Sequence, residues 1–389
     1  MSITTPRGFV AAGLAAGIKV SGALDLALLA TEDGTAVPTA ATFTSNLAAA
    51  APVQVSRAHL AASGGRAAGV LVSSGNANAA TGDRGRADAT AMCTLTADAL
   101  GVATEQILVC STGLIGIPLP MEPIEAGIPR LVAARAGGPE AGADAAAGIL
   151  TTDSGRKEVL VEYPAFTVAG MAKGAGMLAP NMATMLAFLT TDAAVEPGPL
   201  AGLLQAAVDD TFNSMSVDGC TSTNDTVVLM ASGRAGPGDP TLLVDAVTEA
   251  CADLARQMAA DAEGAERIFQ VQVTGARSDG EAHRAARKVA DSLLVKCSIN
   301  GADPYWGRVA SELGSAGVDF DMDRLTIAYG GTTVCRGGIQ VPYDTGAVAA
   351  HMAGSLVHIE CGLDLGAGTG VVMGVELGYG YIDENRTTS

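Results

Sequence analysis

The chain has 389 residues, which exceeds one ordinary hydrophobic core and is enough for two or three domains. Hydrophobic residues make up 48% and charged residues 16%, so a large core is available, while a formal net charge of −18 repels phosphate backbones and anionic membranes. These totals argue against nucleic-acid partners and membrane-surface binding.

The chain start and the cysteines indicate a cytosolic protein. The opening MSITTPRGFVAAG lacks a basic stretch followed by an apolar segment, so we expect no signal peptide and a cytoplasmic location. Charged residues interrupt the apolar segments before they reach membrane-spanning length. The seven cysteines are scattered without metal-ligand or redox spacing, which predicts reduced core residues and no metal site.

The first part of the chain predicts strands that alternate with turns and helices. ATFTSN and APVQVS have strand-like patterns, and VLVSS has the apolar run of a buried strand. The helical spacing of residues 83–101 ends at Gly101, which suits the position after a helix C-terminus. QILVCS predicts a further buried strand, and residues 128–144 predict a helix or a linker.

The middle of the chain predicts a strand pair, an unusual loop and two helices. TTDSGRKEVLVEYP and AFTVAGMAK have the pattern of a hairpin, and Met185–Leu189 has strand character. A proline precedes helical spacing from residue 197, and residues 239–261 form a long amphipathic pattern. The pattern starts again at RIFQVQVTGARSD, which predicts a boundary between a domain of residues 1–275 and one of residues 276–389.

The stretch KGAGMLAPNMATMLAFLTTDA, residues 173–193, places a hydroxyl at Thr184, where a flexible glycine and proline run meets an apolar run. A threonine hydroxyl needs a base to become a nucleophile, and no histidine is near in sequence. Cleavage of the Ala183–Thr184 bond would free an α-amine, whose pKa near 8 suits a general base. The local residues alone favour a threonine that simply caps or pairs at the start of a strand.

Motifs along nearly the whole chain resemble the ornithine acetyltransferase family, also known as glutamate N-acetyltransferases, which are bifunctional in some members. The motifs occur in the family's order: TPRGFVAAG, SGNANAATG, CSTGLIGIPLP, ILTTD, MAKGAGMLAPNMATMLAFLTTDA, TSTNDT, DAEGAE, VTGARSD, LVKCSINGADPYWGR and YIDENRTTS. The resemblance implies self-cleavage between Ala183 and Thr184 into an α chain (1–183) and a β chain (184–389), with Thr184 as nucleophile. It also implies an assembly of two α and two β chains.

The resemblance assigns roles to further residues. Thr112 and Gly113 match the pair that stabilises the oxyanion, and Lys173 and Glu263 match substrate contacts. A loop lysine or carboxylate is otherwise most often solvated, and a Thr-Gly pair after a strand is otherwise a plain turn.

Two motifs leave the assignment of substrate contacts open. Thr151 is the residue carried over from ILTTD, although the adjacent Thr152 is a close second. At the C-terminus the family's asparagine, and the threonine or serine five positions later, correspond to Asp383 and Thr388. The aspartate departs from the family pattern, because an ionised carboxylate accepts hydrogen bonds and cannot donate them.

The resemblance implies a layered α/β catalytic domain with an N-terminal-nucleophile-like active site, related to aminopeptidases, followed by a smaller α/β domain. The expected activity moves an acetyl group from N²-acetyl-L-ornithine to L-glutamate in arginine biosynthesis, without a metal or an organic cofactor. Acetyl-CoA is an additional donor in some relatives. Two alternatives remain open from the sequence: a self-processing aminopeptidase or amidase, which would pass the acyl group to water, and a non-catalytic binding protein with an intact chain.

Overall fold

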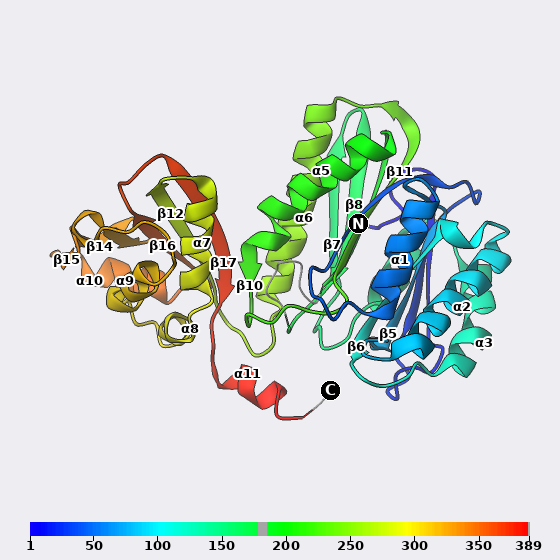
Figure 1. The fold of residues 1–389 in the computed structure, drawn as a ribbon, viewed down its shortest axis with the longest axis horizontal. Helices are drawn as coiled ribbons and strands as arrows, with labels where there is room; N and C mark the ends of the chain where they lie inside the picture. The colour runs from blue at the N-terminus through cyan, green and yellow to red at the C-terminus, as the bar shows by residue number, and fades with distance from the viewer. Residues whose placement is uncertain (178–184, 388–389) are drawn as a thin grey trace.

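The computed structural model of the chain describes residues 1–177 and 185–387. Within them the chain forms an α/β structure with a larger layered domain and a smaller domain, joined near the C-terminal helix (Figure 1). Ala183, Thr184 and Thr388, which the sequence analysis singles out, lie outside the described residues.

Two sheets stack face to face in the larger domain. The N-terminal sheet has the strand order β1-β2-β5-β6, with bounds Phe9–Leu14, Leu26–Thr31, Gly69–Asn76 and Ile107–Leu114. The central sheet has the order β4-β3-β11-β9-β8-β7, with bounds Arg66–Ala67, Val37–Phe43, Thr226–Pro237, Leu186–Ala194, Phe166–Lys173 and Lys157–Tyr163. β5 pairs with β6, and β9 with β11, in parallel, whereas the other neighbours pair antiparallel.

The alternation of side chains along β9 explains the layering. Leu186 and Phe188 join a core between the two sheets, whereas Ala187 and Leu189 join a second core under helices on the outer face. Successive strand residues point to opposite faces, so a strand that is apolar at every position must be covered on both sides. The central sheet therefore needs a sheet on one face and helices on the other.

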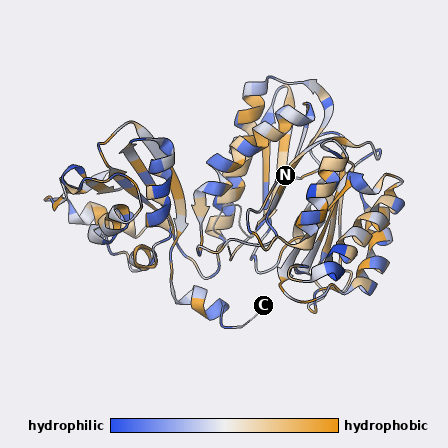
Figure 2. Cartoon of the chain, viewed as in Figure 1, coloured by the Kyte–Doolittle hydropathy of each residue, from blue (hydrophilic) through white to orange (hydrophobic). Residues whose placement is uncertain are grey.

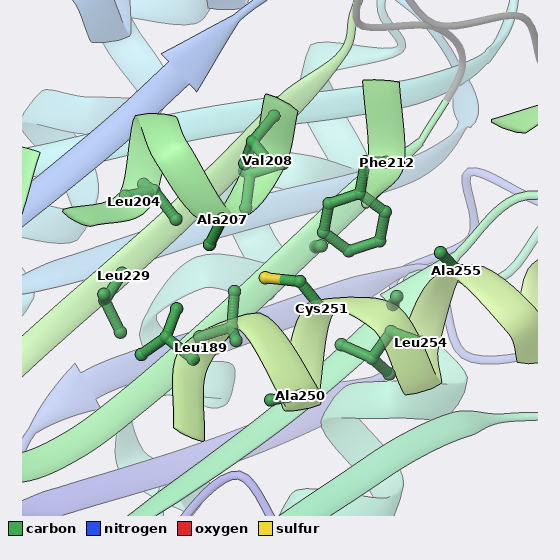
Figure 3. Close-up of a cluster of buried hydrophobic side chains, with 14 of the residues drawn as sticks. Leu189, Leu204, Ala207, Val208, Phe212, Leu229, Ala250, Cys251, Leu254 and Ala255 are labelled. Carbon is green, nitrogen blue, oxygen red and sulfur yellow. The ribbon is translucent and has the colours of Figure 1, made fainter. Parts of the chain in front are cut away.

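Helices complete the helix–sheet–sheet–helix sandwich. The outer face of the central sheet is covered by α5 (Pro197–Asp210) and α6 (Pro240–Ala260), whose packing against Leu189 and Leu229 is drawn in Figure 3. The N-terminal sheet is covered by α1 (Ala51–Ala62), α2 (Gly82–Leu100) and α3 (Met121–Ala134). α4 (Pro139–Gly148) packs against β1 and β2 and adds to the core between the sheets. The layering confirms the predicted layered α/β fold.

The smaller domain is built on a third sheet, the C-terminal sheet. Its order is β10-β17-β12-β16-β13-β14-β15, with bounds Met215–Ser216, Gly368–Val375, Ile268–Ala276, Leu356–Gly362, Thr326–Tyr329, Thr332–Arg336 and Ile339–Gln340. Its helices are α7 (Asp279–Ala290), α8 (Leu293–Asn300), α9 (Trp306–Gly314) and α10 (Thr345–Met352), whereas α11 (Tyr379–Glu384) follows β17 and lies apart from them (Figure 1). Short 3₁₀ helices occupy Thr104–Gln106, Phe212–Ser214 and Met322–Arg324. The coloured ribbon of Figure 2 shows apolar residues gathered inside both domains.

The boundary at residues 275 and 276 that the sequence favours falls within β12. β12 belongs to the C-terminal sheet, and the core of the smaller domain begins at Phe269. β10 comes from the larger domain but pairs in parallel with β17. A strand's apolar pattern shows that it is buried but not which sheet it joins, so the boundary could not be read from the pattern.

Two local expectations are wrong. APVQVS lies in α1 instead of a strand, with a proline in the first helical turn, where its fixed dihedral and missing N–H are tolerated. Every cysteine lies in the described residues and is unpaired, but Cys220 and Cys297 are exposed and not core residues.

Within residues 1–177 and 185–387, no helix combines the length and apolarity that a membrane span requires.

Candidate active site

A pocket of about 520 Å³ brings together most of the predicted site residues that the structure describes. It lies where the ends of β6 and β8 meet the loop before β12 and the residues after α11. The lining includes Thr112, Gly113, Thr151, Thr152, Lys173, Glu263 and Asn385. A larger cleft of about 1090 Å³ lies along α7, but it contains none of the predicted residues.

Thr112 and Gly113 occupy the end of β6, and both line the pocket. Gly113 has φ of +128°, and a Cβ on this residue would collide with the backbone of Gly75 on the paired strand β5. Position 113 therefore requires glycine for two reasons: the positive φ angle and the close approach of the two strands. The result is a hydroxyl and a backbone N–H side by side at a fixed strand end.

Lys173 is the last residue of β8, and it is not a solvated loop lysine. Its side chain is 3% exposed, and its Nζ donates hydrogen bonds to Thr112 Oγ1 at 3.2 Å and Thr151 Oγ1 at 2.6 Å. The carboxylate of Asp153 lies 3.9 Å from Nζ. The ammonium therefore lies at the base of the pocket, between two hydroxyls and a carboxylate.

The side chain of Asp153 is fully buried behind Lys173 and is held by several donors. Its oxygens accept hydrogen bonds from the backbone N–H groups of Thr151 and Gly174 and from Lys157 Nζ. Burial alone would raise the pKa of Asp153, but the positive charges of Lys173 and Lys157 and the donated hydrogen bonds bring it to about 2. The carboxylate is therefore ionised across the physiological range.

Glu263 forms the opposite, anionic side of the pocket. Its backbone N–H donates to the carbonyl of Ala175 at 3.0 Å, and a Cβ on Gly176 would collide with its carboxylate. The glycine-rich loop after β8 therefore packs directly against this carboxylate. Asn385, one residue beyond α11, donates its side-chain amide to Glu263 Oε2 at 2.9 Å.

Asp225 lies at the start of β11, next to the first residue described after the gap. Its Oδ1 accepts the backbone N–H of Met185 at 2.9 Å, while its Oδ2 is buried and has no hydrogen-bond partner in the described part of the chain. Burial raises the pKa of Asp225 well above its usual value, even though the Met185 N–H and the charge of Lys173 oppose the shift. The carboxyl group fixes the backbone at the residue that follows position 184.

The two threonines of ILTTD both line the pocket, and they differ in their contacts. Thr151 accepts the hydrogen bond from Lys173, whereas no such bond is found for Thr152.

The two polar C-terminal residues differ in position, because Asn385 lines the pocket and Asp383 does not. Asp383 is exposed on α11, where it pairs with Arg386, and it is not among the pocket residues.

Sequence reasoning missed Asn385, Asp153 and Asn224. Asn385 is the amide residue in YIDENRTTS. The family's spacing of five positions before a threonine or serine assigns the substrate contact to Asp383 instead. Asn224 lines the pocket and donates to the carbonyls of Ala77 and Ser111, which ties the end of β6 to its neighbouring loop. In the described ranges, no group of three or more histidine, cysteine or acidic residues could hold a metal ion.

Comparisons with known proteins give a consistent result. A sequence profile described as the ArgJ family matches residues 10–387. The "Arginine biosynthesis bifunctional protein ArgJ" of Mycolicibacterium paratuberculosis is 46% identical over 395 residues, which cover 100% of this chain and 96% of that protein.

Solved structures of similar proteins exist. The bifunctional protein argJ of Bacillus halodurans is 38% identical with a TM-score of 0.49, covering 50% of this chain and 95% of that chain. An ornithine acetyltransferase from Mycobacterium tuberculosis, complexed with ornithine, is 45% identical with a TM-score of 0.44, covering 46% and 94%. Because the ArgJ profile spans nearly the whole chain and the mycobacterial relative is similar from end to end, this chain belongs to the ArgJ family.

Proposed function

We propose that the chain is a glutamate N-acetyltransferase that moves an acetyl group from N²-acetyl-L-ornithine to L-glutamate in arginine biosynthesis. The acetyl group is carried on Thr184, which becomes an N-terminal residue when the chain cleaves itself between Ala183 and Thr184. The observation that carries the proposal is the polarity of the pocket: Thr112, Gly113 and Lys173 supply donors on one side, and Glu263 supplies a carboxylate on the other.

This polarity suits an acylated amino acid with a charged side chain. A developing oxyanion or an α-carboxylate is stabilised by hydroxyl, N–H and ammonium donors. The side-chain ammonium of ornithine suits the carboxylate of Glu263, next to the amide of Asn385. The membership of the ArgJ family, whose similar members are named for arginine biosynthesis, supports this choice of substrate.

The first half-reaction forms an acetyl-enzyme. The Thr184 hydroxyl oxygen attacks the acetyl carbonyl carbon of acetylornithine, and the Thr184 α-amine accepts the hydroxyl proton. Thr112 and Gly113 donate hydrogen bonds to the oxyanion. The carbon–nitrogen bond of the amide then breaks, the proton passes from the Thr184 amine to the leaving nitrogen, and ornithine departs.

The second half-reaction reverses these steps with glutamate. The neutral α-amine of glutamate attacks the acetyl ester carbon, the Thr184 amine takes the proton from the attacking nitrogen, and the threonine oxygen leaves as the hydroxyl. The products are N-acetylglutamate and free Thr184. The two steps predict ping-pong kinetics and use neither a metal nor an organic cofactor.

The wider proposal covers the second donor, the assembly and the location. The name "bifunctional" of the relatives supports a second activity. We propose that in this activity acetyl-CoA acetylates glutamate through the same threonine. We infer an assembly of two α chains (1–183) and two β chains (184–389) in the cytoplasm.

The test mixes purified enzyme with acetylornithine, with and without glutamate, and follows N-acetylglutamate, acetate and ornithine. The proposal predicts N-acetylglutamate formation that depends on glutamate, with parallel double-reciprocal lines, and no product from Thr184→Ala. Acetate release that is independent of glutamate would instead identify a hydrolase. Replacing acetylornithine by acetyl-CoA tests the second donor.

A further inference from the structure

The hydrogen bonds of Lys173 determine the direction of two hydroxyl groups in the pocket. An ammonium group has only donors, so Thr112 Oγ1 and Thr151 Oγ1 must both accept from Lys173 Nζ. The proton of each hydroxyl is then free for another acceptor. In the described part of the chain neither hydroxyl donates a hydrogen bond, and both residues line the pocket.

A charged Lys173 therefore gives this side of the pocket donors and not acceptors. A neutral amine would carry a lone pair, and either hydroxyl could then turn and donate to the amine instead of to a ligand. The protonation of Lys173 thus decides whether Thr112 can serve a negative oxygen atom. The same holds for Thr151, whose bond to Lys173 is the shorter of the two, at 2.6 Å compared with 3.2 Å.

Asp153 is placed to keep Lys173 charged and in position. Its side chain is fully buried, and its carboxylate lies 3.9 Å from Lys173 Nζ. Through backbone hydrogen bonds it also fixes Thr151 and Gly174, the residue after Lys173. One carboxylate therefore holds the lysine, the residue that carries one of the hydroxyls, and the first residue of the loop after β8.

The electrostatics agree with this geometry. Burial lowers the pKa of Lys173, and the negative charge of Asp153 is the largest effect that opposes the shift. Other charged groups also act on Lys173. The positive charge of Lys157 lowers the pKa of Lys173, whereas the negative charges of Glu263 and Asp225 raise it. Lys19 also interacts electrostatically with Lys173. Without Asp153, a buried lysine next to Lys157 would lose its proton at a lower pH.

We propose that Asp153 is a positioning residue for acyl transfer, which holds Lys173 as an ammonium so that Lys173 directs the Thr112 and Thr151 hydroxyls into the pocket as donors. The inference rests on the proposed function, because it takes Thr112 as a donor to the oxyanion.

The main test compares Asp153→Asn with Asp261→Asn across the pH range. Asp261 is the other carboxylate bound to Lys157, but it does not contact Lys173, so it is a matched control. For Asp153→Asn we expect kcat to fall about 10–100-fold, the effect of weakening one oxyanion donor, and the alkaline limb of the kcat profile to move to lower pH. Asp261→Asn keeps the alkaline limb of the unmodified enzyme.

Thr151→Val tests the hydroxyl direction without altering the ion pairs. We expect kcat/KM to fall about 10–100-fold, as for loss of a hydrogen bond to a charged group, and Thr151→Ser to restore it. If Asp153→Asn does not fold, as judged by circular dichroism, this pair of variants decides the matter.

The outcomes separate the two proposals. An unmodified enzyme that transfers no acetyl group contradicts the proposed function. An active unmodified enzyme whose alkaline limb is unchanged in folded Asp153→Asn, or whose kcat/KM is unchanged in Thr151→Val, contradicts the role of Asp153 and leaves the proposed function intact.

Discussion

The two sides of the pocket differ in how firmly the fold holds them. Lys173 and Thr112 lie at strand ends and are buried, and Asp153 fixes Gly174, the residue after Lys173. Glu263 is half-buried on a loop, and its partner Asn385 is exposed just beyond the short helix α11. Groups that must meet a transition state need rigid placement, whereas groups that recognise exchangeable substrates tolerate mobility. We therefore expect the buried side to control kcat and the open side to control the choice of substrate.

The largest expected effect is on the buried side. Thr112→Val removes a hydroxyl that Lys173 directs into the pocket, and loss of one oxyanion donor typically costs about 10²–10³ in kcat. Thr112→Ser keeps the hydroxyl and is the matched control. Steady-state kinetics with acetylornithine and glutamate provide the measurement. Equal kcat values for the valine and serine variants would show that the hydroxyl is not the oxyanion donor.

An intermediate effect is expected from Glu263→Gln on the open side. Loss of the negative charge weakens binding of the ornithine side-chain ammonium, so KM for acetylornithine should rise about 10–100-fold, as for a hydrogen-bonded charge pair. KM for glutamate, which has no such ammonium, should change much less. Glu266→Gln, an exposed carboxylate on the same loop, serves as control. A similar rise for both substrates would contradict the assignment of the two sides.

The smallest effect distinguishes Asn385 from Asp383. Asn385→Ala removes the hydrogen bond to Glu263, and we expect KM for acetylornithine to rise about 2–10-fold, in line with one ordinary hydrogen bond. Asp383→Asn should change KM less, because Asp383 is exposed and pairs with Arg386 away from the pocket. A larger effect of Asp383→Asn would indicate that Asp383 contacts substrate.

The sequence predicted the α/β class and most buried strands, because runs such as VLVSS and QILVCS must be covered on both faces. It failed at APVQVS, where alternating valines suggested a strand. Val53 and Val55 are also buried in α1, so a short apolar pattern satisfies either structure. Which sheet β12 joins depends on partners far along the chain, and these leave no local pattern.

Five residues carried over from the resemblance line one pocket, whereas Asp383 does not, and the partners of the five do not follow from the sequence; the five are Thr112, Gly113, Thr151, Lys173 and Glu263. Asp153 is the last residue of the motif ILTTD, in which the resemblance assigns a role to a threonine. The role of Asp153 depends on its hydrogen bonds with Lys157 and with Gly174, and Gly174 lies beyond the β7–β8 hairpin. Asn385 became recognisable only through its bond to Glu263, which is 122 positions away. Contacts of this kind arise from the packing of distant elements and not from spacing.

The central claim is that the chain frees the amine of Thr184 by breaking itself. Mass spectrometry of purified, active enzyme under denaturing conditions tests it most directly. The account predicts two polypeptides, which end at Ala183 and begin at Thr184, and a single uncut chain for Thr184→Ala. Full activity from a polypeptide that is continuous from Met1 to Ser389 would contradict it.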